Sequence, residues 1–208
     1  QSLPMHYAYG LSLINSHLQA GGTVVLTPHS CMRREFWADF ARHACTSFAG
    51  VPYTYELLRR LRLNPATRPT LRTMTQAGGG MRADLLAHYH QAAQQHGKRL
   101  YSMYGQTEAT ARISYVPPER LGEKAGAIGI PIPAGTLSLA PAEDSSEAEE
   151  LLYQGPNVML GYANGPADLA SGDVQQGRLR TGDLGRRDED GYFYLLGRLK
   201  RIGKVFGK

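Results

Sequence analysis

The fold of this chain follows from the stretch RLYSMYGQTEAT, residues 99–110. Its first half, Arg99–Tyr104, is rich in large apolar and aromatic residues, and Gly105 ends the run, which predicts a buried strand followed by a flexible loop. Helical spacing of apolar residues over Ala83–His96 comes just before it, and Gly97 closes that helix. A helix, a strand and a glycine loop in this order are typical of a parallel sheet whose faces are covered by helices.

The segments upstream of residue 83 repeat the same alternation. The residue patterns predict, in order, Thr23–Leu26 (strand), Arg33–Ala44 (helix), Ser47–Val51 (strand), Tyr53–Leu61 (helix) and Leu71–Gln76 (strand). Alternating elements of this kind indicate an α/β fold with a doubly wound, mostly parallel sheet over residues 1–115.

Downstream of residue 115 the pattern changes to short β-prone runs interrupted by glycine and proline. Strands are expected at Gly126–Pro133, Thr136–Ala140, Glu150–Tyr153, Arg178–Thr181 and Tyr192–Leu196. The acidic segment Glu143–Glu150 is expected to be an exposed loop. Arg187–Gly191 is expected to connect a hairpin, because Asp-Gly supplies the backbone angles of such a turn. These runs predict a small antiparallel, β-barrel-like subdomain over residues 116–196.

Composition excludes several classes of protein. With 208 residues, 42% of them hydrophobic and 20% charged, the chain can bury a core and does not resemble a disordered segment. No apolar run approaches the ~20 residues of a membrane helix, so no membrane span is expected. The two cysteines, Cys31 and Cys45, have no metal-ligand or redox-motif spacing, which favours ordinary thiols in a reducing cytoplasm over the alternative of a disulfide.

The net charge of +5 suits an anionic ligand, but it would equally suit nucleic acid or a membrane surface. Basic residues are scattered and concentrate only in Arg198–Lys208. That tail contains a single aromatic residue, Phe206, whereas grooves for single-stranded nucleic acid combine charges with several stacking rings. Nucleic-acid binding is therefore the weakest of the functional alternatives, and no nucleic-acid partner is expected.

Two loops that follow predicted strands carry groups suited to a ligand, since open parallel sheets bind ligands at the carboxyl ends of their strands. Ala77–Gly80 has three glycines, which let a backbone approach a base or a phosphate closely, although such runs also form ordinary tight turns. Tyr104–Thr110 combines a ring that can stack on a base, a hydroxyl, and a carboxylate suited to Mg²⁺. A surface turn around a buried tyrosine is the alternative for this second loop.

The second loop resembles the Tyr-Gly-x-Thr-Glu signature of the adenylate-forming (AMP-binding) superfamily. This superfamily includes acyl-CoA synthetases, fatty acyl-AMP ligases and peptide-synthetase adenylation domains. Five further segments match its motifs in the expected order: Leu3–Gly10, Phe48–Pro52, Gly155–Tyr162, Arg180–Leu184 with Asp188–Tyr192, and Gly197–Lys200. Six ordered matches cover nearly the whole chain, which is therefore similar to a fragment of the large N-terminal domain of an acyl-CoA synthetase or AMP-acid ligase.

The resemblance implies a nucleotide site. Gly78, Gly79 and Gly80 would line the adenine, and Tyr104, followed by Gly105, would stack on the base. Thr107 would contact the α-phosphate, and Glu108 would coordinate Mg²⁺. Asp183 would accept hydrogen bonds from both ribose hydroxyls, and Arg198 would place a positive charge near the ribose or phosphates.

Two further roles concern the acid and the movement of the enzyme. His6 would line or gate the passage to the acyl site, although a lone histidine beside aromatic residues is more often a packed one. Lys200 would be the hinge of a C-terminal lid, or else one more charge in a solvated basic run. Val51–Tyr55 brings two aromatic residues near the expected acid pocket, which favours a bounded or aryl-compatible site.

The resemblance also implies the reaction. ATP and Mg²⁺ would convert a small carboxylic acid to an acyl-AMP, which would pass to the thiol of coenzyme A or of a phosphopantetheine arm on an acyl carrier protein. An amino-acid adenylation domain and a non-catalytic nucleotide-binding or interaction module of the same fold are the alternatives. The implied organisation is an adenylate-binding subdomain at 1–115, truncated on its N-terminal side, a β subdomain at 116–196, and the hinge with the start of a lid at 197–208.

The chain also departs from the family pattern. The family's Ser/Thr/Gly-rich phosphate loop and the lysine of its C-terminal lid have no match in these 208 residues. Glu149 stands where glycine often precedes Glu-Leu, and Gly203 stands where a bulky apolar residue is usual. We therefore expect this chain to bind ATP or AMP weakly and to be inactive by itself.

Overall fold

The structure is a computed structural model that describes residues 2–142 and 145–199. The described residues divide into two compact units, one with residues 2–104 and 116–126 and the other with residues 105–115, 127–142 and 145–199. Within the described ranges, no helix combines the length and apolar character that crossing a bilayer requires.

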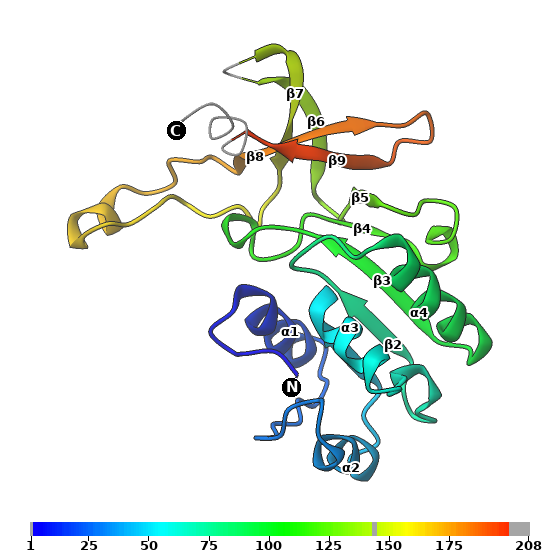
Figure 1. Cartoon of the computed structure of the whole chain (residues 1–208). Helices are drawn as coiled ribbons and strands as arrows, with labels where there is room; N and C mark the ends of the chain where they lie inside the picture. Colours follow the sequence, from blue (N-terminus) through cyan, green and yellow to red (C-terminus); the bar gives the residue numbers. More distant parts are fainter. Residues whose placement is uncertain (1, 143–144, 200–208) are drawn as a thin grey trace, which may run out of the picture. The chain divides into compact units, whose positions relative to one another are not determined.

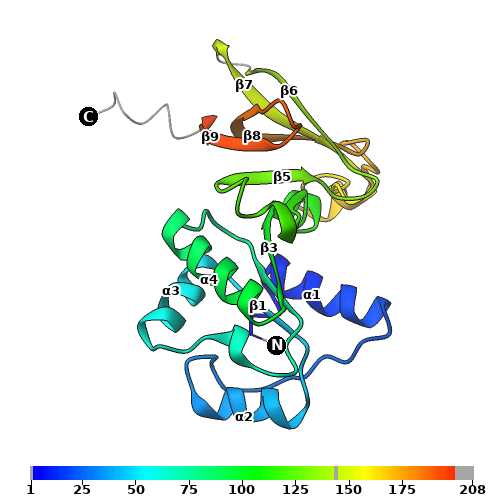
Figure 2. The same cartoon turned by 90° about the vertical axis from the view of Figure 1, so that its right-hand side faces the viewer.

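The first unit contains a parallel sheet covered by helices on both faces, as the sequence predicts. Its strands are β1 (Ser47–Gly50), β2 (Thr73–Gln76) and β3 (Arg99–Tyr104), which pair in that order. Four helices accompany them: α1 (Ala8–Gln19), α2 (Arg34–Arg42), α3 (Pro52–Arg60) and α4 (Ala83–Gln95). Figure 2 shows α1 on one side of the sheet and α3 with α4 on the other, which confirms the doubly wound arrangement.

Helices on both faces are tied to the same residue of the central strand. The hydroxyl of Tyr9 in α1 lies 2.6 Å from Thr75 Oγ1, and the hydroxyl of Tyr55 in α3 donates to the Thr75 carbonyl at 2.9 Å. Tyr55 is fully buried and packs edge-on against Tyr89 of α4, with ring centroids 4.9 Å apart. Tyr55, which the sequence placed near an acid pocket, therefore belongs to the core.

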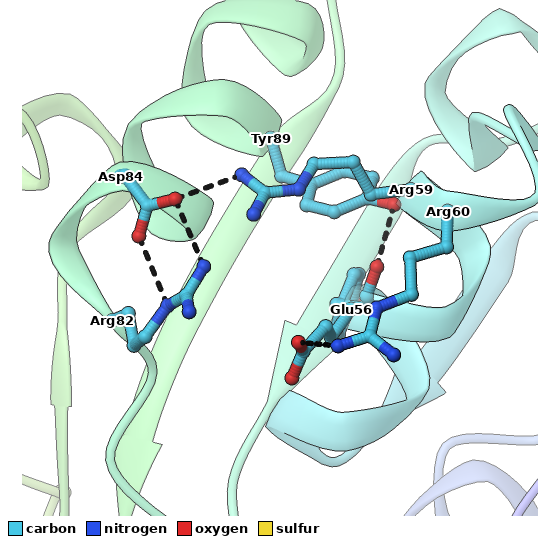
Figure 3. A network of polar contacts seen from close by, with 7 residues as sticks. Glu56, Arg59, Arg60, Arg82, Asp84 and Tyr89 are labelled. Carbon is cyan, nitrogen blue, oxygen red and sulfur yellow. Dashed lines mark hydrogen bonds and ion pairs between the residues drawn. The ribbon is translucent and has the colours of Figure 1, made fainter.

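A polar network connects α3 to the first turn of α4 (Figure 3). Asp84 lies in that turn and accepts hydrogen bonds from Arg59 at 3.0 Å and from Arg82 at 3.1 and 3.2 Å. The bond from Arg59, with further help from Arg82, lowers the pKa of the Asp84 carboxyl. An anion at this end of a helix is also favoured by the helix dipole. The network anchors α4 directly after the glycine loop of residues 77–80.

The predicted strand Thr23–Leu26 is wrong, because this segment lacks strand structure and Leu26 is 64% exposed. A hollow of about 340 Å³ lies beside it, lined by residues of this segment and by Ser47–Ala49 of β1. A β-prone run becomes a strand only when a neighbouring strand satisfies its backbone groups. In the described part of the chain, this run is not one of the strands of the sheet.

The second unit is an antiparallel sheet with strands in the order β4-β5-β9-β8-β7-β6 (Figure 1). Their bounds are β4 (Ser114–Val116), β5 (Ala127–Pro131), β6 (Thr136–Ala142), β7 (Ser145–Gln154), β8 (Arg178–Arg187) and β9 (Phe193–Arg198). The predicted antiparallel subdomain is confirmed, but the sheet is open and does not close into a barrel.

Two expectations for this unit had different outcomes. The hairpin at Arg187–Gly191 is confirmed, since the Asp188 carboxylate accepts a bond from Tyr192 N at 2.8 Å and Gly191 has φ +85°. The expected exposed loop at Glu143–Glu150 is wrong from residue 145 onward, because β7 begins there and Glu150 is only 2% exposed. Strand pairing buries Glu150, and Gly182 N satisfies its Oε1 at 2.8 Å.

Candidate functional site

The glycine loop of the first unit leaves β2 at its carboxyl end. Gly78 has φ +84°, a conformation that side chains disfavour. A Cβ at Gly78 would also collide with the Tyr7 hydroxyl and lie 3.3 Å from Val51 Cγ1. At Gly79 it would meet only Pro52, at 3.6 Å, and at Gly80 it would enter open space. The loop therefore presents bare, exposed backbone beside the ends of β1 and β2.

Two other predicted residues of this unit lie in different settings. His6 is exposed, in the segment that precedes α1. Tyr104 is the last residue of β3 and is buried, with 9% of its surface exposed. Stacking of Tyr104 on a base and a gating role for His6 stay predictions. Tyr7, for which the sequence predicted no role, lies together with Val51 where a side chain at residue 78 would point.

The second unit contains the site loop, which we define as Gly105–Arg112. It includes the 3₁₀ turn Thr107–Ala109, and Thr107 is exposed. Thr110 and Ala111 then adopt left-handed φ values of 52° and 69°, which cost about 1–2 kcal/mol for a residue with a side chain. A Cβ at Gly105 would collide with the Ala111 carbonyl, so the loop folds back closely on this glycine.

A distant segment of the same unit holds the site loop in place. Asn157 Nδ2 donates to the carbonyls of Ala109 at 2.6 Å and Arg112 at 2.9 Å. In return, Thr110 Oγ1 donates to the Asn157 carbonyl at 2.6 Å. The Asn157 side-chain oxygen accepts the hydroxyl of Tyr153 at 2.7 Å. Side chain and backbone of one asparagine thus contact three residues of the loop.

The same segment also contacts Glu108. Met159 N donates to the Glu108 carbonyl at 2.8 Å, and the Tyr162 hydroxyl donates to Glu108 Oε1 at 2.7 Å. The bond to this carboxylate raises the pKa of the Tyr162 phenol, with a smaller contribution from burial. Backbone and side chain of Glu108 therefore both have defined positions within the unit.

Asp183 is buried, with 2% of its surface exposed, and two partners orient it. Its Oδ1 lies 2.6 Å from Arg198 Nε, and its Oδ2 accepts Gln106 Nε2 at 2.8 Å. Asp183 and Arg198 are cross-strand partners in β8 and β9. Gln106 Nε2 also donates to the carbonyl of Thr181 at 2.7 Å. A charge withdrawn from water is stable only with such compensation.

The predicted residues therefore fall into two groups. Gly105, Thr107, Glu108, Asp183 and Arg198 share the second unit, while His6, Gly78, Gly79, Gly80 and Tyr104 share the first. Lys200 lies outside the described residues. Within the described ranges, no cluster of three or more His, Cys, Asp or Glu side chains is arranged to hold a metal ion.

Sequence reasoning missed the residues that support the predicted ones. Asn157 and Tyr162 lie within the matched segment Gly155–Tyr162, and Gln106 is the variable position of the Tyr-Gly-x-Thr-Glu loop. Their partners lie 45 to 77 residues away along the chain. Only their membership of the matched segments indicated that they belong to a site.

Comparison with known proteins gives consistent matches. The family model described as "AMP-binding enzyme" matches residues 1–163. The sulfoacetate–CoA ligase of Cupriavidus necator is 33% identical over 97% of this chain and 39% of that protein. The oxalate–CoA ligase of Arabidopsis thaliana is 30% identical over 96% of this chain and 40% of that protein. This chain thus spans about two fifths of the length of these curated relatives.

Solved structures agree with the sequence matches. The O-succinylbenzoate coenzyme A synthetase of Bacillus subtilis in complex with AMP is 29% identical, with a TM-score of 0.78 over 96% of this chain and 40% of that one. The same enzyme in complex with ATP and magnesium ion is 27% identical, with a TM-score of 0.79 over 100% of this chain and 43% of that one.

Proposed function

This chain belongs to the AMP-binding enzyme family, and from that premise we propose that it is part of an ATP-dependent acid–thiol ligase that activates a carboxylic acid as an acyl-AMP. Its relatives are named as CoA ligases, which supports coenzyme A as the acceptor. Because the chain spans about two fifths of those relatives, the reaction proposed is that of the longer protein.

The observation that carries the proposal is the organisation of the site loop. One turn presents the Thr107 hydroxyl and the Glu108 carboxylate, and the neighbouring Gln106 is bonded to the buried Asp183. A hydroxyl, a carboxylate and a second buried carboxylate suit the phosphate, the metal and the ribose of a nucleotide. The Bacillus subtilis synthetase, a structural neighbour of this chain, has been solved with AMP and with ATP and magnesium.

The residues fit the ligands that the family implies. At Gly80 a Cβ would enter open space, and at Gly79 it would meet only Pro52, at 3.6 Å, so the bare backbone of these two glycines would leave room for a flat base. Mg²⁺ in nucleotide sites is usually held by one or two carboxylates together with phosphates, so Glu108 would suffice on the protein side. Thr107 would hydrogen-bond a phosphate oxygen, and Asp183, oriented by Arg198, would accept the ribose hydroxyls.

The chemistry follows from charge. The substrate carboxylate attacks the α-phosphorus of ATP, the bond to pyrophosphate breaks, and an acyl-AMP forms. Both reactants are anions, so donors and positive charge at the phosphates lower the barrier. Mg²⁺ would supply part of that neutralisation. A thiol of coenzyme A or of a phosphopantetheine carrier would then displace AMP. Arg198 would contribute a fixed positive charge close to the ribose or phosphates.

Two alternative functions can be distinguished from the proposed one by experiment. An amino-acid adenylation domain would share the same nucleotide site, and a non-catalytic module would retain nucleotide binding without turnover. The names of the relatives favour a carboxylic acid that is not an amino acid as the substrate.

The decisive experiment is acid-dependent exchange of pyrophosphate into ATP by the longer protein, with carboxylic acids and amino acids as substrates. Exchange with at least one carboxylic acid, followed by release of AMP when coenzyme A is added, is the expected result. Exchange with amino acids alone would select the adenylation domain. Nucleotide binding in calorimetry without any exchange would select the non-catalytic module.

A further inference from the structure

We propose that Asn157 is a positioning residue for the reaction: it sets the conformation of the site loop and thereby the places of Thr107 and Glu108. The inference rests on the proposed function. Neither the residue's match within Gly155–Tyr162 nor any comparison assigns it a role. It is carried by four hydrogen bonds, two left-handed residues and two further contacts to Glu108.

The hydrogen bonds specify an asparagine. A carboxamide has two N–H donors on nitrogen and one accepting oxygen. The two donors of Asn157 face carbonyl oxygens, and its oxygen faces a hydroxyl of Tyr153. Burial raises the pKa of Tyr153, so this phenol stays a donor throughout the neutral range. Aspartate has the same shape but no donor at neutral pH, and it would place a negative oxygen against both carbonyls.

The hydrogen bonds of Asn157 reach the part of the loop that has the unfavourable backbone conformation. Two of their acceptors, the carbonyls of Ala109 and Arg112, flank the left-handed residues Thr110 and Ala111. Thr110 itself is bonded to the Asn157 backbone. Unfavourable backbone conformations persist only where surrounding contacts over-determine them. Asn157 supplies three such contacts from a single position.

The strained pair controls the direction in which the preceding turn points. The Ala111 amide donates to the Gln106 carbonyl at 2.9 Å, so the chain returns to the start of the turn that carries Thr107 and Glu108. The segment after Asn157 then fixes Glu108 twice, through Met159 N and the Tyr162 hydroxyl. If the hydrogen bonds of Asn157 to the site loop were lost, the loop would relax, and the Thr107 hydroxyl and the Glu108 carboxylate would move together.

The test replaces Asn157 with aspartate in the longer protein and measures acid-dependent pyrophosphate exchange. Displacing catalytic groups by about 1 Å costs up to about a hundredfold in rate, so we expect kcat to fall at least about tenfold and the Mg²⁺ concentration for half-maximal rate to rise. The KM for the acid should stay within about twofold, because the loop's groups serve the nucleotide and not the acid. Asn15→Asp, on the exposed surface of α1, is the matched control for the added charge.

A purely structural role gives a different result. In that case Asn157→Asp lowers the Tm and the folded fraction, while the folded molecules keep the wild-type kcat and Mg²⁺ dependence, and the inference is overturned. Asn157→Gln tests the chemistry further, since it retains the donors and should recover more activity than aspartate. A wild-type protein without exchange for any acid would instead remove the proposed function, and the positioning role with it.

A second readout is independent of catalysis. Hydrogen–deuterium exchange of the present chain should show faster exchange in residues 105–112 for Asn157→Asp, by about tenfold or more, with residues 73–76 of β2 unchanged. Unchanged exchange in the site loop would show that Asn157 does not set its conformation, and would overturn the inference whatever the activity of the longer protein.

Discussion

The phenolic hydroxyl of Tyr162 donates to Oε1 of Glu108 at 2.7 Å, although 54 residues separate the two along the chain. Glu108 is the carboxylate that we assign to Mg²⁺, so this bond gives the proposed metal site a spectroscopic reporter. The bond to the carboxylate is also the main reason why the pKa of Tyr162 is raised above that of an ordinary tyrosine.

Binding of Mg²⁺ with ATP is therefore expected to lower the pKa of Tyr162. The cation neutralises Glu108 and competes for the oxygen that accepts the phenol. The change is measured as the difference between alkaline absorbance titrations of the wild type and Tyr162→Phe. Glu108→Gln should lower the same pKa without Mg²⁺ and abolish the response to it. A response to Mg²⁺ that survives in Glu108→Gln would place the metal elsewhere.

Gly78→Ala should destabilise the first unit by about 1–3 kcal/mol. The alanine would adopt a left-handed φ, and its Cβ would collide with the Tyr7 hydroxyl. Gly80→Ala is the control, because its Cβ enters open space, and it should change the free energy of unfolding by less than about 0.5 kcal/mol. Urea denaturation measures both. Equal losses for the two variants would contradict the geometry described for the loop.

Asp183→Asn should cost more stability than Arg198→Ala. The amide keeps the shape of the carboxylate but removes the buried charge that both Gln106 and Arg198 face, for which we expect a loss of about 2 kcal/mol. The Arg198 side chain is 58% exposed, so after its removal water can reach Asp183 Oδ1 and take the place of the guanidinium, and the loss should be about 1 kcal/mol or less. The comparison uses denaturant unfolding, with exposed Asp173→Asn as the surface control. The reverse order of losses would disprove this account of Asp183.

The first unit is expected to lose stability in alkali. Burial raises the pKa of Tyr89 to about 12 and that of Tyr55 well above 10, so both are protonated in the folded state over a pH range where the unfolded chain ionises them. Their contribution to the free energy of unfolding is complete below pH 10 and is lost as the pH rises toward 12. Raising the pKa of Tyr89 from 10 to about 12 contributes on the order of 2 kcal/mol to the stability below pH 10.

The measurement is the free energy of unfolding from pH 8 to 12 for the wild type and Tyr89→Phe. Phenylalanine keeps the buried ring but cannot ionise, so the variant should show a shallower loss above pH 10. It also removes the bond from the Tyr89 hydroxyl to the Tyr55 carbonyl, so its stability at pH 8 should be lower by about 1 kcal/mol. Parallel curves for the two proteins would exclude Tyr89 as the titrating group.

The sequence by itself determined the alternation of the first unit and the positions of its ligand loops. Strand and helix periods are local properties, so Arg99–Tyr104 could be recognised as a strand and Ala83–His96 as a helix to within one residue of the observed bounds. The ordered motifs indicated the family for the same reason, since each motif is a short stretch of consecutive residues. Neither the element pattern nor the motifs depend on contacts between distant parts of the chain.

Tertiary structure alone decided which residues support those loops. Thr23–Leu26 has the composition of a strand but is not part of the sheet in the described part of the chain. Glu150 is buried in β7, which lies between β6 and β8. The bonds of Asn157 to the site loop and of Gln106 to Asp183 join segments 45 to 77 residues apart. Such contacts depend on how sheets and loops bring distant segments together, and no local periodicity records them.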